Sequence, residues 1–419
     1  MVERRALLVC YYFPPLGGAG VGRPLALFKG LAEHGYNCDV LTVKPVAYRV
    51  YEPELLEGLE VQRVYRARSF DPQRLLYLLG VRKVRAATIR RGRKVADRFF
   101  PDSKVGWVKP AVKLGRTLAG NRGYDVIVST SPPVSAHLVA RRLSADFRLP
   151  WVADFRDYWT ASTPEEWYSD SRQAVRAHAL LDAIKKDASV RTTVNETVAA
   201  FLDGAEVIRN SYDESLAGLW TRPPSAEVFT IGLFGTFNDD YPVEPLLRLL
   251  DRLRNRAKEL HERVRLLQVG DVEPAWLKSC LARFGLEDRC EIHHFVPRAE
   301  AVKILSRSHL FYLGMPSEKH AGISTGRIYL LLASGRPILA ATNPDSEVAG
   351  LIEVSQNGFC FEEGNKEAAV SYLARLIEAF LSDSLSSTPL PEYARQFSSE
   401  NMVAGFAAIF DRVVSGRRS

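Results

Sequence analysis

Short apolar stretches alternate with longer amphipathic stretches along most of the chain. The apolar stretches are typical of buried strands, whereas the amphipathic stretches repeat their apolar positions every three to four residues, as helices do. The first half of the chain predicts strands at residues 7–12, 38–43, 61–65, 125–129 and 151–153, and helices at residues 24–34 and 135–143. Strands and helices that alternate in this way favour a parallel sheet with helices on both faces.

The same pattern starts again after a proline-containing segment, residues 220–225, which we interpret as a linker. The second half predicts strands at residues 229–234, 265–269, 290–295, 310–313 and 337–340, and helices at residues 244–260, 274–284, 299–307, 327–333 and 400–414. The predicted fold class is therefore α/β, with two Rossmann-like, doubly wound parallel-sheet domains. The predicted divisions are residues 1–220, residues 221–395 and a C-terminal helix within residues 396–419. Because open parallel sheets bind ligands at the carboxyl ends of their strands, we expect the two sheets to face each other across a cleft.

Composition excludes several classes of protein. Of the 419 residues, 46% are apolar and 25% are charged, which is ordinary for a globular chain and excludes a largely disordered or collagen-like one. No apolar run approaches the length that crosses a bilayer, and the first apolar stretch ends at Pro14 and Pro15, which predicts a strand rather than a signal peptide. The five cysteines form no CxxC pair, so we predict buried thiols in a reducing, cytoplasmic location. The net charge of +7 favours anionic partners.

A glycine-rich loop, residues 17–22, follows the first predicted strand, and Arg23 comes directly after it. Glycines let backbone amides approach an anion, and the start of the next helix adds a positive partial charge. The loop is not a dinucleotide fingerprint, because Arg23 takes the third glycine position and the second strand ends without a carboxylate. It predicts contact with a phosphate or an acceptor. The alternative is a tight turn that needs small residues.

A second loop of small and hydroxyl-bearing residues precedes the predicted helix at 327–333. Its members are Gly322, Ile323, Ser324 and Thr325, and Arg327 stands on the first turn of the helix. Such a loop forms an anion nest, and an arginine there can bind a diphosphate with two hydrogen bonds. The alternative is plain capping by Ser324 or Thr325, with Arg327 solvated.

Four stretches, residues 11–23, 125–159, 231–236 and 325–339, resemble in this order a retaining glycosyltransferase of the GT-B fold, similar to the family 4 enzymes of bacterial polysaccharide assembly. The resemblance implies that the second domain holds a nucleotide-diphosphate sugar, while a glycan or lipid-linked acceptor faces the first domain. It also implies that the cleft closes and that the C-terminal helix crosses back to the first domain. The sugar nucleotide is then a co-substrate, and neither a cofactor nor a metal is expected.

The predicted site residues fall into three groups. We expect catalytic roles for His137, Arg156 and Asp157 and acceptor binding by Arg23, Thr130 and Ser131. The donor group is Gly17, Gly18, Gly235, Thr236, Glu318, Gly322, Ile323, Ser324, Thr325 and Arg327. The alternatives are a structural ion-pair cluster around Arg156 and a capping or packing role for His137. No metal site is predicted, because Asp239 and Asp240 are adjacent and His293 and His294 lack further ligands at a useful spacing.

The chain departs from the family pattern at the donor helix. The two positions at which the family carries glutamates are Gly322 and Leu330 here, and Glu318 is the nearby carboxylate that could substitute. Leucine cannot accept hydrogen bonds from a ribose. Two alternatives therefore stay open: a non-catalytic binding or scaffold subunit of a polysaccharide assembly system, and an enzyme of the same fold that resembles nucleotide-sugar epimerases.

Residues 73–98 form a basic segment in which nine cations and interleaved leucines accompany one acid, Asp97. A basic amphipathic helix can lie on an anionic membrane, so we predict peripheral attachment to the inner face of the membrane. The alternative is a solvated helix that packs on the first domain. Nucleic acid is not an expected partner, because no aromatic stacking platform accompanies the charge.

Overall fold

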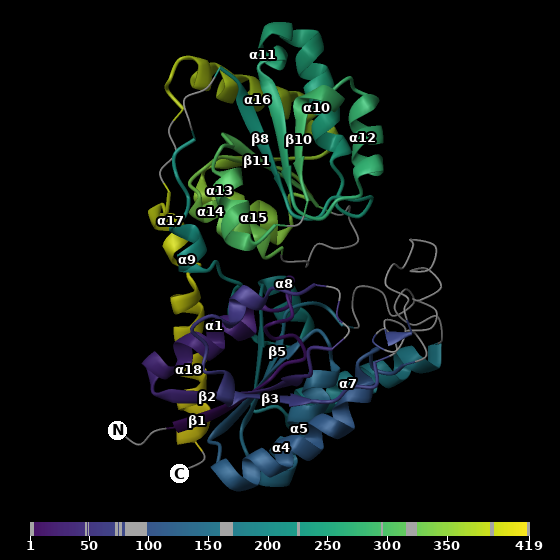
Figure 1. Ribbon diagram of the computed structural model, residues 1–419, viewed down its shortest axis with the longest axis vertical. Coiled ribbons are helices and arrows are strands. Elements are labelled where there is room, and N and C mark those ends of the chain that lie inside the picture. Colours follow the sequence, from purple (N-terminus) through teal and green to yellow (C-terminus); the bar gives the residue numbers. More distant parts are fainter. Residues whose placement is uncertain are drawn as a thin grey trace. The chain divides into compact units, whose positions relative to one another are not determined.

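The computed structural model describes residues 4–46, 48, 50–71, 74, 78–79, 99–159, 171–223, 227–294, 296–315, 325–385 and 389–416 (Figure 1). The predicted donor residues Glu318, Gly322, Ile323 and Ser324 lie outside the described residues, as does the basic segment apart from Arg74, Leu78 and Leu79. The chain divides into two compact units. Unit 1 is Met1–Asn210 with Ser399–Ser419, and unit 2 is Ser211–Ser398.

Unit 1 is built on a seven-stranded sheet in the order β3-β2-β1-β4-β5-β6-β7, with every pair parallel. Its strands are β1 (Arg4–Val9), β2 (Tyr36–Val43), β3 (Val64–Ala67), β4 (Val126–Ser131), β5 (Trp151–Phe155), β6 (Val190–Thr193) and β7 (Glu206–Val207). Its helices are α1 (Gly22–Gly30), α4 (Val108–Arg122), α5 (Ser135–Phe147), α7 (Ser171–Asp187), α8 (Glu196–Phe201) and α18 (Ser399–Ser415).

Alternate residues of each strand of unit 1 enter different hydrophobic cores, because successive side chains of a strand point to opposite faces. Leu7 and Val9 of β1 pack in the core that α4, α5 and α7 cover. Ala6 and Leu8 pack in the other core, with α1 and α18. Figure 1 shows α18, in yellow, alongside α1. The last helix of the chain is thus part of the core of unit 1.

Unit 2 is built on a six-stranded parallel sheet in the order β10-β9-β8-β11-β12-β13. Its strands are β8 (Phe229–Phe234), β9 (Val264–Val269), β10 (Cys290–His293), β11 (Leu310–Gly314), β12 (Ile338–Ala341) and β13 (Gly358–Phe361). Its helices are α9 (Glu214–Ala217), α10 (Glu244–Arg256), α11 (Lys258–Glu262), α12 (Pro274–Ala282), α13 (Arg298–Leu305), α14 (Arg327–Ala333), α15 (Glu347–Ser355), α16 (Lys366–Leu381) and α17 (Glu392–Arg395). One core lies under α10, α12 and α16 and the other under α13, α14 and α15.

The prediction of two doubly wound, parallel-sheet α/β units is confirmed. The boundaries differ from the predicted residues 220 and 395, since residues 211–220 belong to unit 2. The cause is Trp220, which is buried in a core of unit 2 and whose Nε1 donates a hydrogen bond to the carbonyl of Leu330 at 3.1 Å. The predicted helix at 244–260 is also divided, because Ala257 takes a non-helical conformation between α10 and α11.

In the described ranges, the structure contains no helix that is both long enough and apolar enough to span a membrane.

Candidate functional site

In unit 2, the loops that follow β8 and β9 pack backbone against backbone. Gly235 has a φ of +95°, and a Cβ on Gly270 would lie 2.6 Å from the carbonyl oxygen of Gly235. Only glycine fits such a contact without a shift of the backbone. The side chain of Gln268 fixes the same carbonyl, because its Nε2 donates a hydrogen bond to it at 3.0 Å. These contacts form a fixed surface at the carboxyl edge of the sheet, where open parallel sheets bind ligands.

Arg327, the first residue of α14, lies on this surface. Its Nη1 donates hydrogen bonds to the carbonyls of Phe234 at 2.6 Å and Thr236 at 3.3 Å. Its Nε donates to Oγ1 of Thr325 at 3.2 Å. Within the described part of the chain, Nη2 has no acceptor. The guanidinium group is therefore held in place by three hydrogen bonds to described residues of unit 2, none of which uses Nη2.

Two aromatic rings complete the surroundings of Arg327. The guanidinium carbon lies 5.8 Å from the ring centre of Phe237 and 5.4 Å from that of Tyr241. Burial lowers the pKa of the Arg327 guanidinium, yet an arginine remains charged at any physiological pH. The sequence analysis did not identify Phe237 and Tyr241. The signal that could have found them is the occurrence of two aromatic residues directly after a predicted strand.

The structure thus brings together four of the predicted donor residues in unit 2: Gly235, Thr236, Thr325 and Arg327. The alternative of a solvated Arg327 is wrong, because its side chain is partly buried and forms three hydrogen bonds. The helix itself has seven residues, so the positive charge at its start comes mainly from Arg327.

In unit 1, Arg23 and Thr130 belong to one buried network around Asp154. The carboxylate of Asp154 accepts hydrogen bonds from Arg23 at 2.9 and 2.7 Å, from Thr130 at 2.7 Å and from Thr192 at 2.8 Å. Arg23 and Asp154 are 5% and 0% exposed. Burial raises the pKa of Asp154, but Arg23 and the two hydroxyls outweigh it and leave the pKa below its usual value. The network joins α1 to β4, β5 and β6. Acceptor binding by Arg23 and Thr130 stays a prediction, and their observed contacts are structural.

Arg156 follows β5, and its side chain is hydrogen-bonded to three backbone carbonyls. Its side chain donates hydrogen bonds to the carbonyls of Ser131 at 3.0 Å, Gly20 at 3.1 Å and Pro132 at 3.1 Å. It thereby joins the glycine-rich loop to the end of β4. The neighbouring Asp157 is exposed. Of the predicted catalytic residues, Asp157 therefore presents a carboxylate at the surface, while Arg156 holds the loops together.

His137 is completely buried in unit 1. Its Nδ1 lies 2.8 Å from Oγ of Ser129, which also accepts a hydrogen bond from Nε1 of Trp151. The ring packs 4.4 Å, between centroids, from Phe155. Burial lowers the pKa of His137 to about 3, so the imidazole is neutral at physiological pH. This is the position of a packed core residue, and the catalytic role of His137 stays a prediction.

The glycine-rich loop is hydrogen-bonded to the carboxylate of Glu52. The amide of Gly18 donates a hydrogen bond to Oε1 of Glu52 at 2.8 Å, and that of Gly17 donates to the carbonyl of Val50 at 2.9 Å. A Cβ on Gly17 would lie 2.3 Å from the same Glu52 oxygen. A side chain at position 17 would therefore displace the Glu52 carboxylate from this position. The predicted donor contacts of Gly17 and Gly18 stay predictions.

Metal-ligating side chains do not gather in the residues that the structure describes. No group of three or more His, Cys, Asp or Glu residues there lies close enough to share an ion.

The fold is that of the two-domain GT-B glycosyltransferases. Sucrose-phosphate synthase from Thermosynechococcus elongatus shares 14% identity, with 99% of this chain and 100% of that chain covered and a TM-score of 0.66. HepE from Anabaena, in a structure with UDP-glucose, shares 17% identity over 97% and 99% of the two chains, with a TM-score of 0.62. WaaG, a glycosyltransferase of lipopolysaccharide biosynthesis, shares 11% identity over 97% and 99%, with a TM-score of 0.58.

Within this class of fold, residues 228–379 match the family described as "Glycosyl transferases group 1". The matched residues lie within unit 2. A comparison of the sequence with curated proteins gives no match. The predicted resemblance to GT-B glycosyltransferases is confirmed, whereas the assignment to family 4 and to polysaccharide assembly stays a prediction.

Proposed function

We propose that the protein is a glycosyltransferase that moves a sugar from a nucleotide-diphosphate sugar to a glycan or lipid-linked acceptor. The observation that carries the proposal is the family match of residues 228–379, which contain the whole Arg327 surface. The UDP-glucose in the HepE structure supports a nucleotide-sugar donor, and the role of WaaG in lipopolysaccharide synthesis supports a glycan acceptor.

In the proposed reaction, the bond between the sugar and the diphosphate breaks while the acceptor oxygen bonds to the same face of the sugar, so the configuration is retained. The leaving phosphate oxygen takes the proton of the acceptor hydroxyl, and no strong protein base is needed. Nη2 of Arg327 stabilises the charge that develops on the diphosphate, which is where a fixed cation accelerates the reaction most. The expected reaction uses no metal and no cofactor.

A non-catalytic binding subunit is the second candidate, and Leu330 is the observation that favours it. The Leu330 side chain is 9% exposed and packs in a hydrophobic core of unit 2. It therefore offers no hydrogen bond to a ribose. An epimerase-like enzyme of the same fold would also bind the nucleotide sugar, but it would not transfer the sugar to an acceptor.

We expect a nucleotide to stabilise the protein against heat. A panel of UDP, GDP, TDP and CMP at about 100 times the dissociation constant should include one member that stabilises unit 2 by about 2.7 kcal/mol. For a unit of this size, the unfolding midpoint then rises by roughly 5–10 °C. A sugar-transfer assay with the stabilising nucleotide's sugar separates the enzyme from the binding subunit. Unchanged midpoints across the whole panel would contradict the donor site.

We expect EDTA to leave sugar transfer unchanged, because Arg327 supplies the positive charge that a metal ion supplies in other transferases. The measurement is the rate of transfer before and after chelation. A rate that falls with EDTA and recovers with magnesium or manganese would contradict a metal-independent reaction.

The proposal includes a cytoplasmic location and reversible contact of residues 73–98 with an anionic membrane. Its support is the excess of cations over acids in this segment, since each cation near an anionic surface contributes about 1 kcal/mol.

A further inference from the structure

Unit 1 contains a pocket of about 910 Å³ that none of the predicted site residues lines. It lies where β2 and β3 end, beside the short 3-10 turn η4 (Val105–Trp107) and the start of α4. Five cations line it: Lys44, Arg66, Arg68, Lys109 and Lys113. The remaining lining is Ala67, Phe70, Val105, Gly106, Val108, Pro110, Leu114 and Thr117, so no acidic residue occurs among the described residues that line the pocket.

The charge of these five cations is not neutralised by the described residues. None of the five forms an ion pair there, and Arg66 donates its hydrogen bonds to the carbonyls of Val43 and Pro14. Arg66 is partly buried, and burial lowers the pKa of its guanidinium. A partly buried cation without a carboxylate is stabilised by a bound anion.

The start of α4 adds to the positive potential. Lys109 and Lys113 stand four residues apart, so their like charges repel each other on one face of the helix. The first turn of α4 holds no acidic residue, and the N-terminal end of a helix is itself positive. Two lysines one turn apart and a lysine at the positive end of a helix are both unfavourable, and an anion between the two lysines would relieve both effects.

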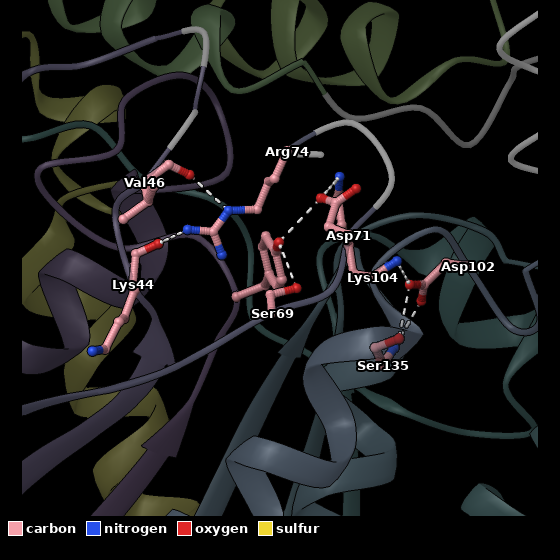
Figure 2. Close-up of polar contacts among 9 residues, drawn as sticks. Lys44, Val46, Ser69, Asp71, Arg74, Asp102, Lys104 and Ser135 are labelled. Carbon is pink, nitrogen blue, oxygen red and sulfur yellow. Dashed lines mark hydrogen bonds and ion pairs between the residues drawn. The ribbon is translucent and has the colours of Figure 1, made fainter. Parts of the chain in front are cut away.

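Neighbouring cations that do have partners hold the wall of this pocket in place (Figure 2). Lys104 is buried and forms an ion pair with Asp71, which also accepts a hydrogen bond from the Tyr11 hydroxyl at 3.1 Å. Arg74 donates hydrogen bonds to the carbonyls of Lys44 and Val46. The loops that carry Lys44 and Phe70 are therefore fixed before any ligand arrives.

Asp102 fixes the segment that leads to Val105, a residue that lines the pocket. Its carboxylate accepts hydrogen bonds from the amide and the hydroxyl of Ser135 at the start of α5, both at 2.8 Å. Its Oδ1 also accepts a hydrogen bond from the amide of Lys104 at 2.8 Å. Asp71, Asp102 and Lys104 of this framework have charged or hydrogen-bonding partners, whereas none of the five cations of the pocket forms an ion pair with an acid among the described residues. We therefore interpret the paired charges of the framework as structural and the five cations of the pocket as ligand-binding.

The rest of the lining is mostly apolar. Phe70 is 65% exposed, although it is a large hydrophobic side chain, and Val108 and Leu114 lie beside the two lysines of α4. A free phosphate would gain nothing from such a surface, whereas a hydrocarbon chain would remove it from water at about 25 cal/mol per Å².

We propose that this pocket binds a phosphate-bearing lipid, with the phosphate between Arg66, Lys109 and Lys113 and the hydrocarbon against Phe70 and Leu114. The identification of this lipid as the carrier of the sugar acceptor rests on the proposed function, whereas the binding itself does not.

The test is isothermal titration of the full chain with dodecyl phosphate below its micellar concentration. Inorganic phosphate and dodecyl maltoside, which has the same chain without the charge, are titrated in parallel. Dodecyl phosphate should bind at least tenfold more tightly than either, because each of the other probes matches half of the pocket. Equal binding of the two dodecyl compounds overturns the proposal, and so does equal binding of dodecyl phosphate and inorganic phosphate.

Variants test the position of the site. The double substitution Lys109→Gln with Lys113→Gln should weaken dodecyl phosphate binding about thirtyfold, at about 1 kcal/mol per lysine. The matched control, Lys278→Gln with Lys303→Gln, removes the same charge from exposed positions of unit 2 and should bind normally. Phe70→Ser keeps the charge and should also weaken binding. Equal affinity of all variants overturns the site, as does binding to anionic vesicles without binding to the monomeric lipid.

The nucleotide panel on the same double variant separates this proposal from the proposed function. Loss of lipid binding with an unchanged nucleotide shift supports the pocket. A normal nucleotide shift without any lipid binding by the wild-type chain overturns the pocket and leaves the donor site intact.

Discussion

Replacing Arg327 with alanine is expected to lower kcat/KM for sugar transfer by roughly 30- to 900-fold. The side chain is fixed by three hydrogen bonds and two aromatic rings, so its charge is in place before the diphosphate charge develops. Removing one such donor costs about 2–4 kcal/mol of transition-state stabilisation. The measurement is steady-state kinetics together with the affinity for the nucleoside diphosphate.

The control for this variant is Arg248→Ala, which removes an arginine from an exposed ion pair on α10 of the same unit. It should keep kcat/KM within about twofold of the wild type, because an exposed pair contributes little. Thermal unfolding of both variants shows whether loss of the hydrogen bonds to Phe234 and Thr236 disturbs unit 2. A folded Arg327→Ala protein with normal kcat/KM would show that the arginine serves the loops and not the donor.

Replacing Arg23 with glutamine is expected to lower the free energy of unfolding of unit 1 by about 3–5 kcal/mol. The substitution leaves the carboxylate of Asp154 completely buried without its cation, and an uncompensated buried charge is costly. The unfolding midpoint should fall by roughly 6–20 °C in differential scanning calorimetry. An exposed pair on the same unit serves as the control: Arg116→Gln, opposite Asp146, should change the midpoint little.

The pH dependence of the Arg23→Gln effect identifies Asp154 as its cause. The native pKa of Asp154 in the wild type is lowered, so the stability that it contributes is present above about pH 3.9 and is lost as the pH falls through the native pKa. Without Arg23, burial dominates and the native pKa lies above that of the unfolded chain, so the variant loses stability as the pH rises. The difference between the two proteins should therefore shrink toward about pH 3. A difference that stays constant with pH would indicate lost packing and not a buried charge.

The alternation of apolar and amphipathic stretches was enough to predict both sheets, because a strand buried on both faces and its covering helices leave different periods in the sequence. The strands predicted at 229–234 and the helix at 327–333 agree with β8 and α14 to the residue. The four-residue strand β6 and the short edge strands β7 and β13 were not predicted. β7 has two residues, and β13 begins with a glycine, so neither carries enough periodic signal.

The hydrogen-bond and ion-pair partners of individual side chains were harder to predict than the helices and strands. Arg23 follows a glycine-rich loop, which favours an interpretation as a ligand-binding residue, yet its partner Asp154 lies 131 positions away and nothing local indicates the pair. The cations of the lipid pocket are also far apart in the sequence, since they come from three separate segments of unit 1. The two lysines of α4 form its only local signal, a spacing of four at a helix start without an acid.

The chain leaves unit 1 at Asn210 and returns to it at Ser399, and this order has a consequence for the protein during its synthesis. Met402, Phe406 and Phe410 of α18 pack on α1 and the sheet, and the ring of Phe410 lies 5.4 Å from that of Tyr36. On the ribosome, all of unit 2 emerges before these side chains do. Unit 2 can thus fold before α18, the helix that covers one of the cores of unit 1, has been made. The apolar face of α1 that α18 later covers then stays exposed for the time needed to translate nearly two hundred residues, about 10–40 s at 5–20 residues per second.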